Sequence, residues 1–352
     1  MNSSNPLIFD GHNDVLSKIF SEGGVIKAAS FYNGRKGALD LKKAQVGGFG
    51  GGFFAVYVPS HFDLEYSYQE MEKAQYSLPL PDSIEWSDAV GVVASQVTIL
   101  RKLERMGGLV ICRSVSDIRN AFSKGKIAAI FHIEGAEAID PDLHMLEVLH
   151  SAGLRSIGPV WSRPTIFGEG VPFSFPSSPD IGSGLTEQGI ALVKRCNELK
   201  IMLDLSHLNE AGFWDVVHYS EAPLVATHSN VHSITPHSRN LTNDQLRAIK
   251  DSDGMVGLNF ATAFLREDGK MLADVPMAQI LKHLDYLIEV LGEDRVGFGS
   301  DYDGAVMPDQ LHDVSALPNL RHAMTDHGYD EILIKKICHE NWLRVLETTW
   351  GS

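Results

Sequence analysis

The amino-acid sequence predicts an α/β fold of the (β/α)8 TIM-type barrel class. Eight short apolar segments alternate along the chain with longer amphipathic stretches. Nearly continuous apolar runs are typical of parallel strands that helices cover on both faces. Eight such strands in alternation with helices is the count of this barrel, whose active site lies at the carboxyl ends of the strands. Polar side chains that can bind metal stand at several of these ends.

The expected strands are rich in Val, Ile, Leu, Phe and Gly and cover residues 7–12, 52–58, 127–133, 154–160, 201–206, 223–227, 255–259 and 296–300. Between them Leu and Ile recur three and four residues apart, which predicts helices over residues 187–199, 242–250 and 277–291.

Two long connections complete the expected fold. Residues 60–125 should contain further helices, including one around residues 88–106. Residues 163–185 are rich in Pro, Gly and Ser, which predicts a long loop over the strand ends. A substrate lid and an ordinary surface loop both stay open for this segment.

The length of 352 residues fits a single barrel domain over residues 1–352. The formal net charge is −15 and the pI is about 5.4, which argues against a nucleic-acid partner because phosphate binding draws on clustered Lys and Arg. Cys112, Cys196 and Cys338 are odd in number and scattered among apolar neighbours. Buried free thiols are therefore expected rather than disulfides.

The amino terminus, residues 1–6, is short and polar, and the apolar stretch after it contains Asp10, so no signal peptide is expected. No run approaches the roughly 20 apolar residues that a membrane span needs. We therefore expect a cytoplasmic protein without a membrane partner, and the sequence leaves a homodimer open.

Five candidate metal ligands lie at four of the expected strand ends. His12 and Asp14 are two residues apart, so a strand can direct both side chains toward one ion. Glu134 follows an apolar strand, where a buried carboxylate is costly unless it pairs with a cation or another charged group. His207 and His228 end two consecutive strands and should lie side by side. Histidine and carboxylate together suit a borderline divalent ion such as zinc.

Two further histidines lie near these ends. His132 precedes Glu134 in the same strand and is expected to be a core or supporting residue. His232 is expected to lie in a loop.

Six short motifs occur in order along almost the whole chain: Asp10-Gly11-His12-Asn13-Asp14, Ile133-Glu134-Gly135, Asp204-Leu205-Ser206-His207, Thr227-His228-Ser229, Ser238-Arg239-Asn240 and Gly297-Phe298-Gly299-Ser300-Asp301-Tyr302-Asp303-Gly304. Together they resemble the membrane dipeptidase (renal dipeptidase) family, peptidase family M19 of the amidohydrolase superfamily. The resemblance implies a barrel with two zinc ions, one on His12 and Asp14 and the other on His207 and His228, with Glu134 bridging them.

The resemblance also implies roles for two residues outside the ligand set. Asp301 would take part in proton transfer, and Arg239 would hold the substrate carboxylate. Two cations sharing a water hold it as a bridging hydroxide near a polarised carbonyl. A nearby carboxylate such as Asp301 can then carry a proton to the leaving amine. A guanidinium binds a carboxylate through two parallel hydrogen bonds, although a surface ion pair stays open for Arg239.

This chain departs from the family at the end of the fourth strand. It has Val160-Trp161-Ser162-Arg163 where the animal enzymes carry a histidine thought to assist the substrate carbonyl or the tetrahedral intermediate. Trp161 offers only an indole N–H and a flat surface, so it is expected to line the substrate site without acting as a charged electrophile. Arg163 either substitutes for the histidine or is a structural residue of an exposed loop.

The function expected is that of a binuclear zinc dipeptidase acting on small dipeptides with a free carboxylate. A tolerance of a D-configured carboxyl-terminal residue is carried over from the family. One alternative is an amidohydrolase of the same fold that acts on another small amide or a lactam, because fold does not fix substrate. The other is a metal-free binding barrel, which the presence of all five expected ligands disfavours.

Overall fold

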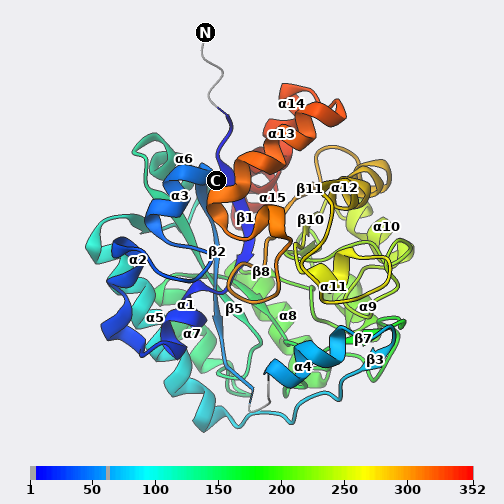
Figure 1. The fold of residues 1–352 in the computed structure, drawn as a ribbon. Coiled ribbons are helices and arrows are strands. Elements are labelled where there is room, and N and C mark those ends of the chain that lie inside the picture. The colour runs from blue at the N-terminus through cyan, green and yellow to red at the C-terminus, as the bar shows by residue number, and fades with distance from the viewer. Residues whose placement is uncertain (1–4, 61–63, 352) are drawn as a thin grey trace.

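Eight parallel strands surround a common axis in the computed structural model, which describes residues 5–60 and 64–351 (Figure 1). Residues 1–4 of the polar amino terminus, residues 61–63 of the long connection and residue 352 lie outside the described part. The barrel strands are β1 (Ile8–Asn13), β2 (Phe49–Tyr57), β5 (Ile127–Glu134), β6 (Leu154–Gly158), β8 (Met202–Leu203), β9 (Val225–Ala226), β10 (Met255–Leu258) and β11 (Val296–Phe298).

The strands pair in the order β8-β6-β5-β2-β1-β11-β10-β9. A parallel bridge between Asp204 and Val225 then links the two strands at the ends of this order. The predicted α/β barrel is therefore confirmed, with all eight strands in the expected segments.

Two strands are much shorter than the sequence predicts. Strands β8 and β9 have two residues each, although the apolar segments run over residues 201–206 and 223–227. The Asp204 carboxylate accepts the backbone N–H groups of Ser206 and Thr227, at 3.1 and 2.9 Å. These amides are therefore bonded to a side chain instead of a strand ladder.

Helices surround the barrel (Figure 1). They are α1 (Val15–Ser21), α2 (Ser30–Asn33), α3 (Leu41–Gly47), α4 (Leu64–Met71), α5 (Trp86–Met106), α6 (Val115–Ser123), α7 (His144–Ala152), α8 (Glu187–Leu199), α9 (Glu210–Tyr219), α10 (Asn243–Asp251), α11 (Thr262–Leu265), α12 (Met277–Leu291), α13 (Leu317–His327), α14 (Glu331–Lys335) and α15 (Asn341–Trp350). Helices α8 and α12 have the predicted bounds. Helix α10 begins one residue late because Thr242 is its N-cap and forms a capping box with Gln245.

Three short strands were not predicted. Strand β4 (Leu109–Ile111) pairs with the first residues of β5, beside the part of β5 that β6 does not reach. Strands β3 (Tyr76–Ser77) and β7 (Ser174–Phe175) form a separate antiparallel pair. This pair joins the two long connections, so the segment over residues 163–185 is anchored to the 60–125 segment.

The two ends of the barrel are built differently. In Figure 1 α13 and α14 lie at one end, and α4, β3 and β7 lie at the other. At the amino ends of the strands, Phe9, Met202 and Met255 belong to one buried cluster with Trp342 of α15. The Trp342 indole donates a hydrogen bond to the Phe298 carbonyl at 3.0 Å. Helix α15 therefore closes the barrel with an aromatic side chain at the amino ends of the strands.

Glycines make room for this indole. A Cβ atom at Gly11 would lie 2.6 Å from a ring carbon of Trp342 and 2.2 Å from the Thr227 carbonyl oxygen. A Cβ atom at Gly257 would lie 2.9 Å from the same ring carbon and 2.0 Å from the same oxygen. Such approaches leave no space for any larger residue at these strand positions.

The expected free thiols are confirmed: Cys112, Cys196 and Cys338 are all buried and unpaired. Among the described residues, no helix has both the length and the apolar character required to cross a membrane.

We predict that Trp342→Ala lowers the free energy of unfolding by about 3–5 kcal/mol, because it empties a fully buried aromatic site. Chemical denaturation followed by circular dichroism measures the change. Trp214 of α9 is 39% exposed and provides the matched control, since Trp214→Ala should alter stability by only about 0.5 kcal/mol. Equal losses in the two variants would show that Trp342 does not close the barrel in the way we describe.

Candidate active site

Side chains from four strand ends converge at the end of the barrel opposite Trp342. His12 lies on β1, and Asp14 follows as the N-cap residue of α1. The Nε2 atom of His12 lies 3.3 Å from Oδ2 of Asp14 and 3.6 Å from Oε2 of Glu134, the last residue of β5. One carboxylate oxygen of Glu134 therefore faces the His12–Asp14 pair.

The other Glu134 oxygen faces a second pair. Its Oε1 atom lies 3.0 Å from Nε2 of His207 and 3.5 Å from Nε2 of His228. The two histidine Nε2 atoms are 3.1 Å apart. The five residues that the sequence predicts as metal ligands therefore lie together. Glu134 is between His12 on one side and His207 and His228 on the other.

Burial and charge work against each other in this cluster. Burial alone raises the pKa of Glu134, but the charge of His12 and the nearby ring nitrogens of the three histidines hold that pKa well below its usual range. Burial lowers the pKa of His12, and the carboxylates of Glu134 and Asp14 raise it well above its usual value. Burial raises the pKa of Asp14 to about 7. Negative charge at this place is therefore stable only beside a compensating positive charge.

The donor set suits a divalent metal ion. The Nε2 atom of His12, which faces Asp14 and Glu134, is buried and lacks a hydrogen-bond partner among the described residues, and coordination of a cation would satisfy it. Histidine nitrogens and carboxylate oxygens are the ligands that zinc commonly takes. The chemistry of the residues therefore fits the metal that the sequence predicts.

Asp301 lies directly beside this cluster. One of its carboxylate oxygens is within 4.8 Å of ligand atoms of His12 and Asp14. Its Oδ2 atom accepts a hydrogen bond from Asn259 at 3.0 Å, and burial raises its pKa. Asp301 has a φ of +65°, a left-handed conformation that is costly for most residues but that aspartate adopts more readily. The turn after β11 therefore directs an acid with a raised pKa toward the predicted metal ligands.

Arg239 is close to the cluster but is bonded to the backbone. Its Nη1 atom donates to the Ser206 carbonyl, and its Nη2 atom donates to the His228 carbonyl at 3.1 Å. The side chain is buried, and burial lowers its pKa to about 10. Arg239 does not line the cavity over the cluster, so its role in binding a carboxylate stays a prediction.

Trp161 forms part of an aromatic wall. Its ring centroid lies 5.8 Å from His207, 5.1 Å from Tyr57 and 5.6 Å from Phe173. These four side chains line one cavity of about 310 Å³ together with Glu134 and Asp301. Trp161 thus lies where a residue that contacts substrate is expected.

The expectation that Arg163 lies in an exposed loop was wrong. Arg163 is fully buried, and its Nη2 atom donates to Oε1 of Glu137 at 2.6 Å. It also donates to the Ser60 hydroxyl and the Val58 carbonyl, and its guanidinium carbon lies 5.5 Å from the centroid of the Trp161 ring. Arg163 is therefore a structural residue behind the aromatic wall and does not replace the missing family histidine.

The remaining predicted histidines take the expected places. His132 is fully buried, and its Nδ1 atom lies 2.9 Å from the Ser156 hydroxyl. His232 is in a loop and bonds the Ser177 carbonyl at 2.8 Å.

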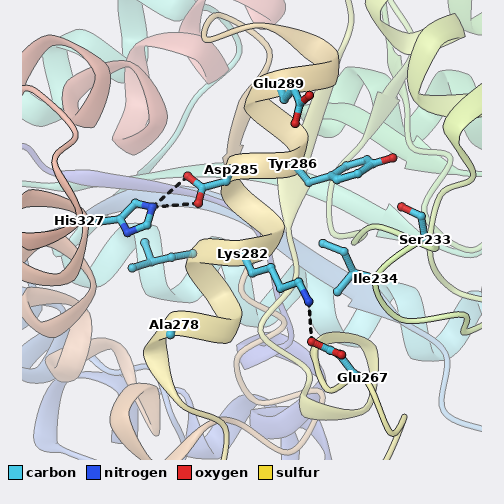
Figure 2. Close-up of a pocket in the computed structure, with 10 residues that line it drawn as sticks. Ser233, Ile234, Glu267, Ala278, Lys282, Asp285, Tyr286, Glu289 and His327 are labelled. Atoms are coloured by element: carbon cyan, nitrogen blue, oxygen red, sulfur yellow. Dashed lines mark hydrogen bonds and ion pairs between the residues drawn. The ribbon is translucent and has the colours of Figure 1, made fainter.

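A second hollow, of about 560 Å³, lies on the outer face of the barrel beside α12 (Figure 2). Its charged groups are largely paired: Lys282 contacts Glu267 at 2.6 Å, and Asp285 contacts His327 at 2.8 Å. It includes none of the clustered histidines and carboxylates found among the described residues. The smaller cavity is therefore the candidate active site.

Sequence reasoning did not assign roles to the polar residues beneath the ligands. Ser162 lies 2.9 Å from Nδ1 of His207, and Thr227 lies 2.8 Å from Nδ1 of His228. Asn259 holds Asp301. Their positions at strand ends next to predicted site residues are the one signal that could have identified them.

A family model described as membrane dipeptidase (peptidase family M19) matches residues 3–350. A metallopeptidase from Rhodobacter sphaeroides, whose structure contains a phosphinate mimic of the dipeptide L-Ala-D-Ala, is 51% identical; the match covers 99% of this chain and 100% of that one, with a TM-score of 0.97.

Two further relatives support the same assignment. The dipeptidase AC, a family M19 metallopeptidase, is also 51% identical over 99% of this chain and 100% of that one, with a TM-score of 0.96. An uncharacterized protein in the pqqA 5′ region of Klebsiella pneumoniae is 47% identical over 75% of this chain and 98% of that protein. The chain therefore belongs to the membrane dipeptidase family, peptidase family M19, and is a metal-dependent dipeptidase of that family.

Proposed function

We propose that this protein is a binuclear zinc dipeptidase that hydrolyses small dipeptides, including those with a D-configured carboxyl-terminal residue. The position of Glu134 carries the proposal, because each of its oxygens faces a different set of ligand-type atoms. His12 and Asp14 would hold one zinc ion, His207 and His228 would hold the other, and Glu134 would bind both. The dipeptide mimic named for the Rhodobacter sphaeroides relative supports the substrate class and its stereochemistry.

When bound, the ions would activate a water molecule and polarise the scissile carbonyl. The residues around them would handle the protons. Asn259 holds Oδ2 of Asp301, so Oδ1 is the atom we propose to take a proton from the water and deliver it to the leaving nitrogen. A pKa raised by burial suits a group that must both accept and donate a proton near neutral pH.

The cavity has the size and the lining for a small substrate. Its volume is about 310 Å³, and Trp161, Phe173 and Phe264 supply an apolar surface beside the ligands. These side chains would pack against substrate and exclude water from the reacting bond. Trp161 would act through this contact alone, since its indole cannot carry positive charge.

Arg239 retains the capacity to bind the substrate carboxylate. A guanidinium has five N–H donors, and the bonds to Ser206 and His228 use two of them. Its Nε atom is buried and has no partner among the described residues. We propose that the remaining donors hold the carboxylate of the dipeptide after a small rotation of the side chain.

We predict that the purified chain holds close to two zinc ions and hydrolyses both L-Ala-L-Ala and L-Ala-D-Ala. Removal of metal with a chelator should abolish both activities, and added zinc should restore them, because the ligands cannot activate water alone. Metal analysis and amino-acid release measure the two properties. Glu134→Gln is the control and should lose much of the metal, since a neutral amide cannot balance two cations. Full occupancy in that variant would contradict bridging, and a dizinc protein inactive on both dipeptides would favour another amide or a lactam.

Asp301→Asn should retain the metal and lower turnover by about a hundredfold or more, because an amide cannot shuttle the proton. Steady-state kinetics with metal analysis tests this. Asp303 offers a matched comparison: it also lines the cavity, but Arg35 and the Ala38 amide hold its carboxylate at 2.6 and 2.7 Å. Asp303→Asn should therefore affect turnover far less. Near-normal turnover in Asp301→Asn would place the proton shuttle elsewhere.

Arg239→Ala should lower kcat/KM for free dipeptides by about 30-fold to 1000-fold, the loss expected for about 2–4 kcal/mol of charge-assisted hydrogen bonding. The corresponding dipeptide amide lacks the carboxylate and should lose much less. Kinetics with the paired substrates measures the difference. Equal losses would show that Arg239 acts only on the strand ends, through the Ser206 and His228 carbonyls.

A further inference from the structure

A buried carboxylate lies beneath the two neighbouring histidines. Asp204 is 4% exposed and is surrounded by hydrogen-bond donors. Its Oδ1 atom accepts from the Ser206 amide at 3.1 Å, the Ser206 hydroxyl at 2.6 Å and the Thr227 amide at 2.9 Å. Its Oδ2 atom accepts from the Thr227 hydroxyl at 2.5 Å. A carboxylate that accepts several hydrogen bonds, two of them from backbone amides, is held in its charged form, so Asp204 accepts at both oxygens and has no hydrogen to donate.

These hydrogen bonds determine whether the Thr227 hydroxyl donates to His228 or accepts from it. A threonine hydroxyl has one hydrogen, and here Asp204 accepts it. The Thr227 oxygen also lies 2.8 Å from Nδ1 of His228. That contact is a hydrogen bond only if Nδ1 carries the hydrogen and the oxygen accepts it. The Nε2 atom of His228 then has a free lone pair, and this is the atom that faces Glu134 and His207.

We infer that Asp204 and Thr227 are positioning residues that select the Nδ1–H tautomer of His228 and fix its ring for metal binding. The inference rests on the proposed function, which supplies the metal. A histidine ligand usually donates its second N–H to a carboxylate or a carbonyl, and loss of such a partner commonly weakens metal binding 10-fold to 100-fold. Here a threonine hydroxyl links the ring to the carboxylate.

The neighbouring histidine is held differently. The Ser162 hydroxyl lies 2.9 Å from Nδ1 of His207, but it is not committed to a carboxylate. It can donate to the ring or accept from it, so this contact does not select a tautomer. The effect of Thr227 should therefore concern one of the two metal ions.

Asp204 is close enough to His12 and His228 to be considered a metal ligand itself. Its position argues against that role, because its Oδ2 atom approaches His228 from the Nδ1 side, at 3.8 Å. The ligand atom of His228 is on the opposite side of the ring, beside Glu134. Asp204 also does not line the cavity. It therefore acts through Thr227.

The test compares Thr227→Val, which keeps the shape and removes the hydroxyl, with Thr227→Ser, which keeps the hydroxyl. Thr235→Val is the matched control, since it removes a buried threonine hydroxyl 3.4 Å from Nε2 of His283, a histidine that lies outside the ligand set. Each full-length protein is stripped of metal and titrated with zinc against a competing chelator. Thr227→Val should bind one of two ions about 10-fold to 100-fold more weakly. Thr227→Ser and Thr235→Val should bind both ions as the parent does.

A second measurement needs no variant. Nitrogen-15 NMR of the metal-free parent, with labelled histidine, should show His228 as the Nδ1–H tautomer, and an Nε2–H tautomer would overturn the inference. Zinc affinity unchanged in Thr227→Val, or weakened equally in Thr235→Val, would also overturn it while leaving the dizinc proposal intact. A parent that binds no zinc would overturn both proposals.

Discussion

The burial of one carboxylate in the mouth of the barrel is the constraint around which this protein is built. Glu134 is 5% exposed, and an isolated anion at such a place costs several kcal/mol. Three histidine nitrogens within 3.6 Å of its oxygens supply the compensation. Because these histidines come from three other strand ends, the charge of Glu134 is satisfied only when the barrel has closed. The charged groups of the site are therefore compensated only in the folded barrel.

One end of the barrel is packed with apolar side chains, and the other end holds the charged groups of the candidate active site. At the amino ends of the strands, Trp342 fills the space that Gly11 and Gly257 leave open, in a region without charged groups of the site. At the carboxyl ends, the charged groups are exposed to a cavity whose walls come from α1 and from the connections that follow the strands. The pairing of β3 with β7 joins two of these connections over the barrel mouth. A rigid base thus supports an opening whose shape depends on loops.

Buried polar side chains support the site residues from behind. Arg163 and Glu137 form an ion pair behind Trp161, and Asp204 collects hydrogen bonds behind His228. Each network uses partners that are fixed by strands or by other buried groups. Residues without access to the cavity therefore restrict the orientation of Trp161, which lines it, and of His228 beneath it. Arrangements of this kind commonly determine how precisely a metal or a substrate is held.

The sequence by itself determined the eight strand segments, the helices α8 and α12, and the convergence of the five residues proposed as metal ligands. These predictions succeeded because apolar periodicity is local and because all strands of a parallel barrel end on one side. The tertiary structure decided the burial and the hydrogen-bond partners of polar side chains, which a local sequence pattern does not contain. Arg163 seemed exposed because its partner Glu137 is 26 residues away, and Arg239 is bonded to carbonyls of other segments.

The same reason explains the remaining differences. Strand β4 exists because β6 leaves the start of β5 unpaired, and Thr227 acquires its function only where β8 brings Asp204 beside it. Whether a polar residue is exposed, paired or directed at a ligand depends on groups that folding delivers from distant parts of the chain. A sequence pattern can identify such a residue, but the cost of burying it without a partner is settled only in three dimensions.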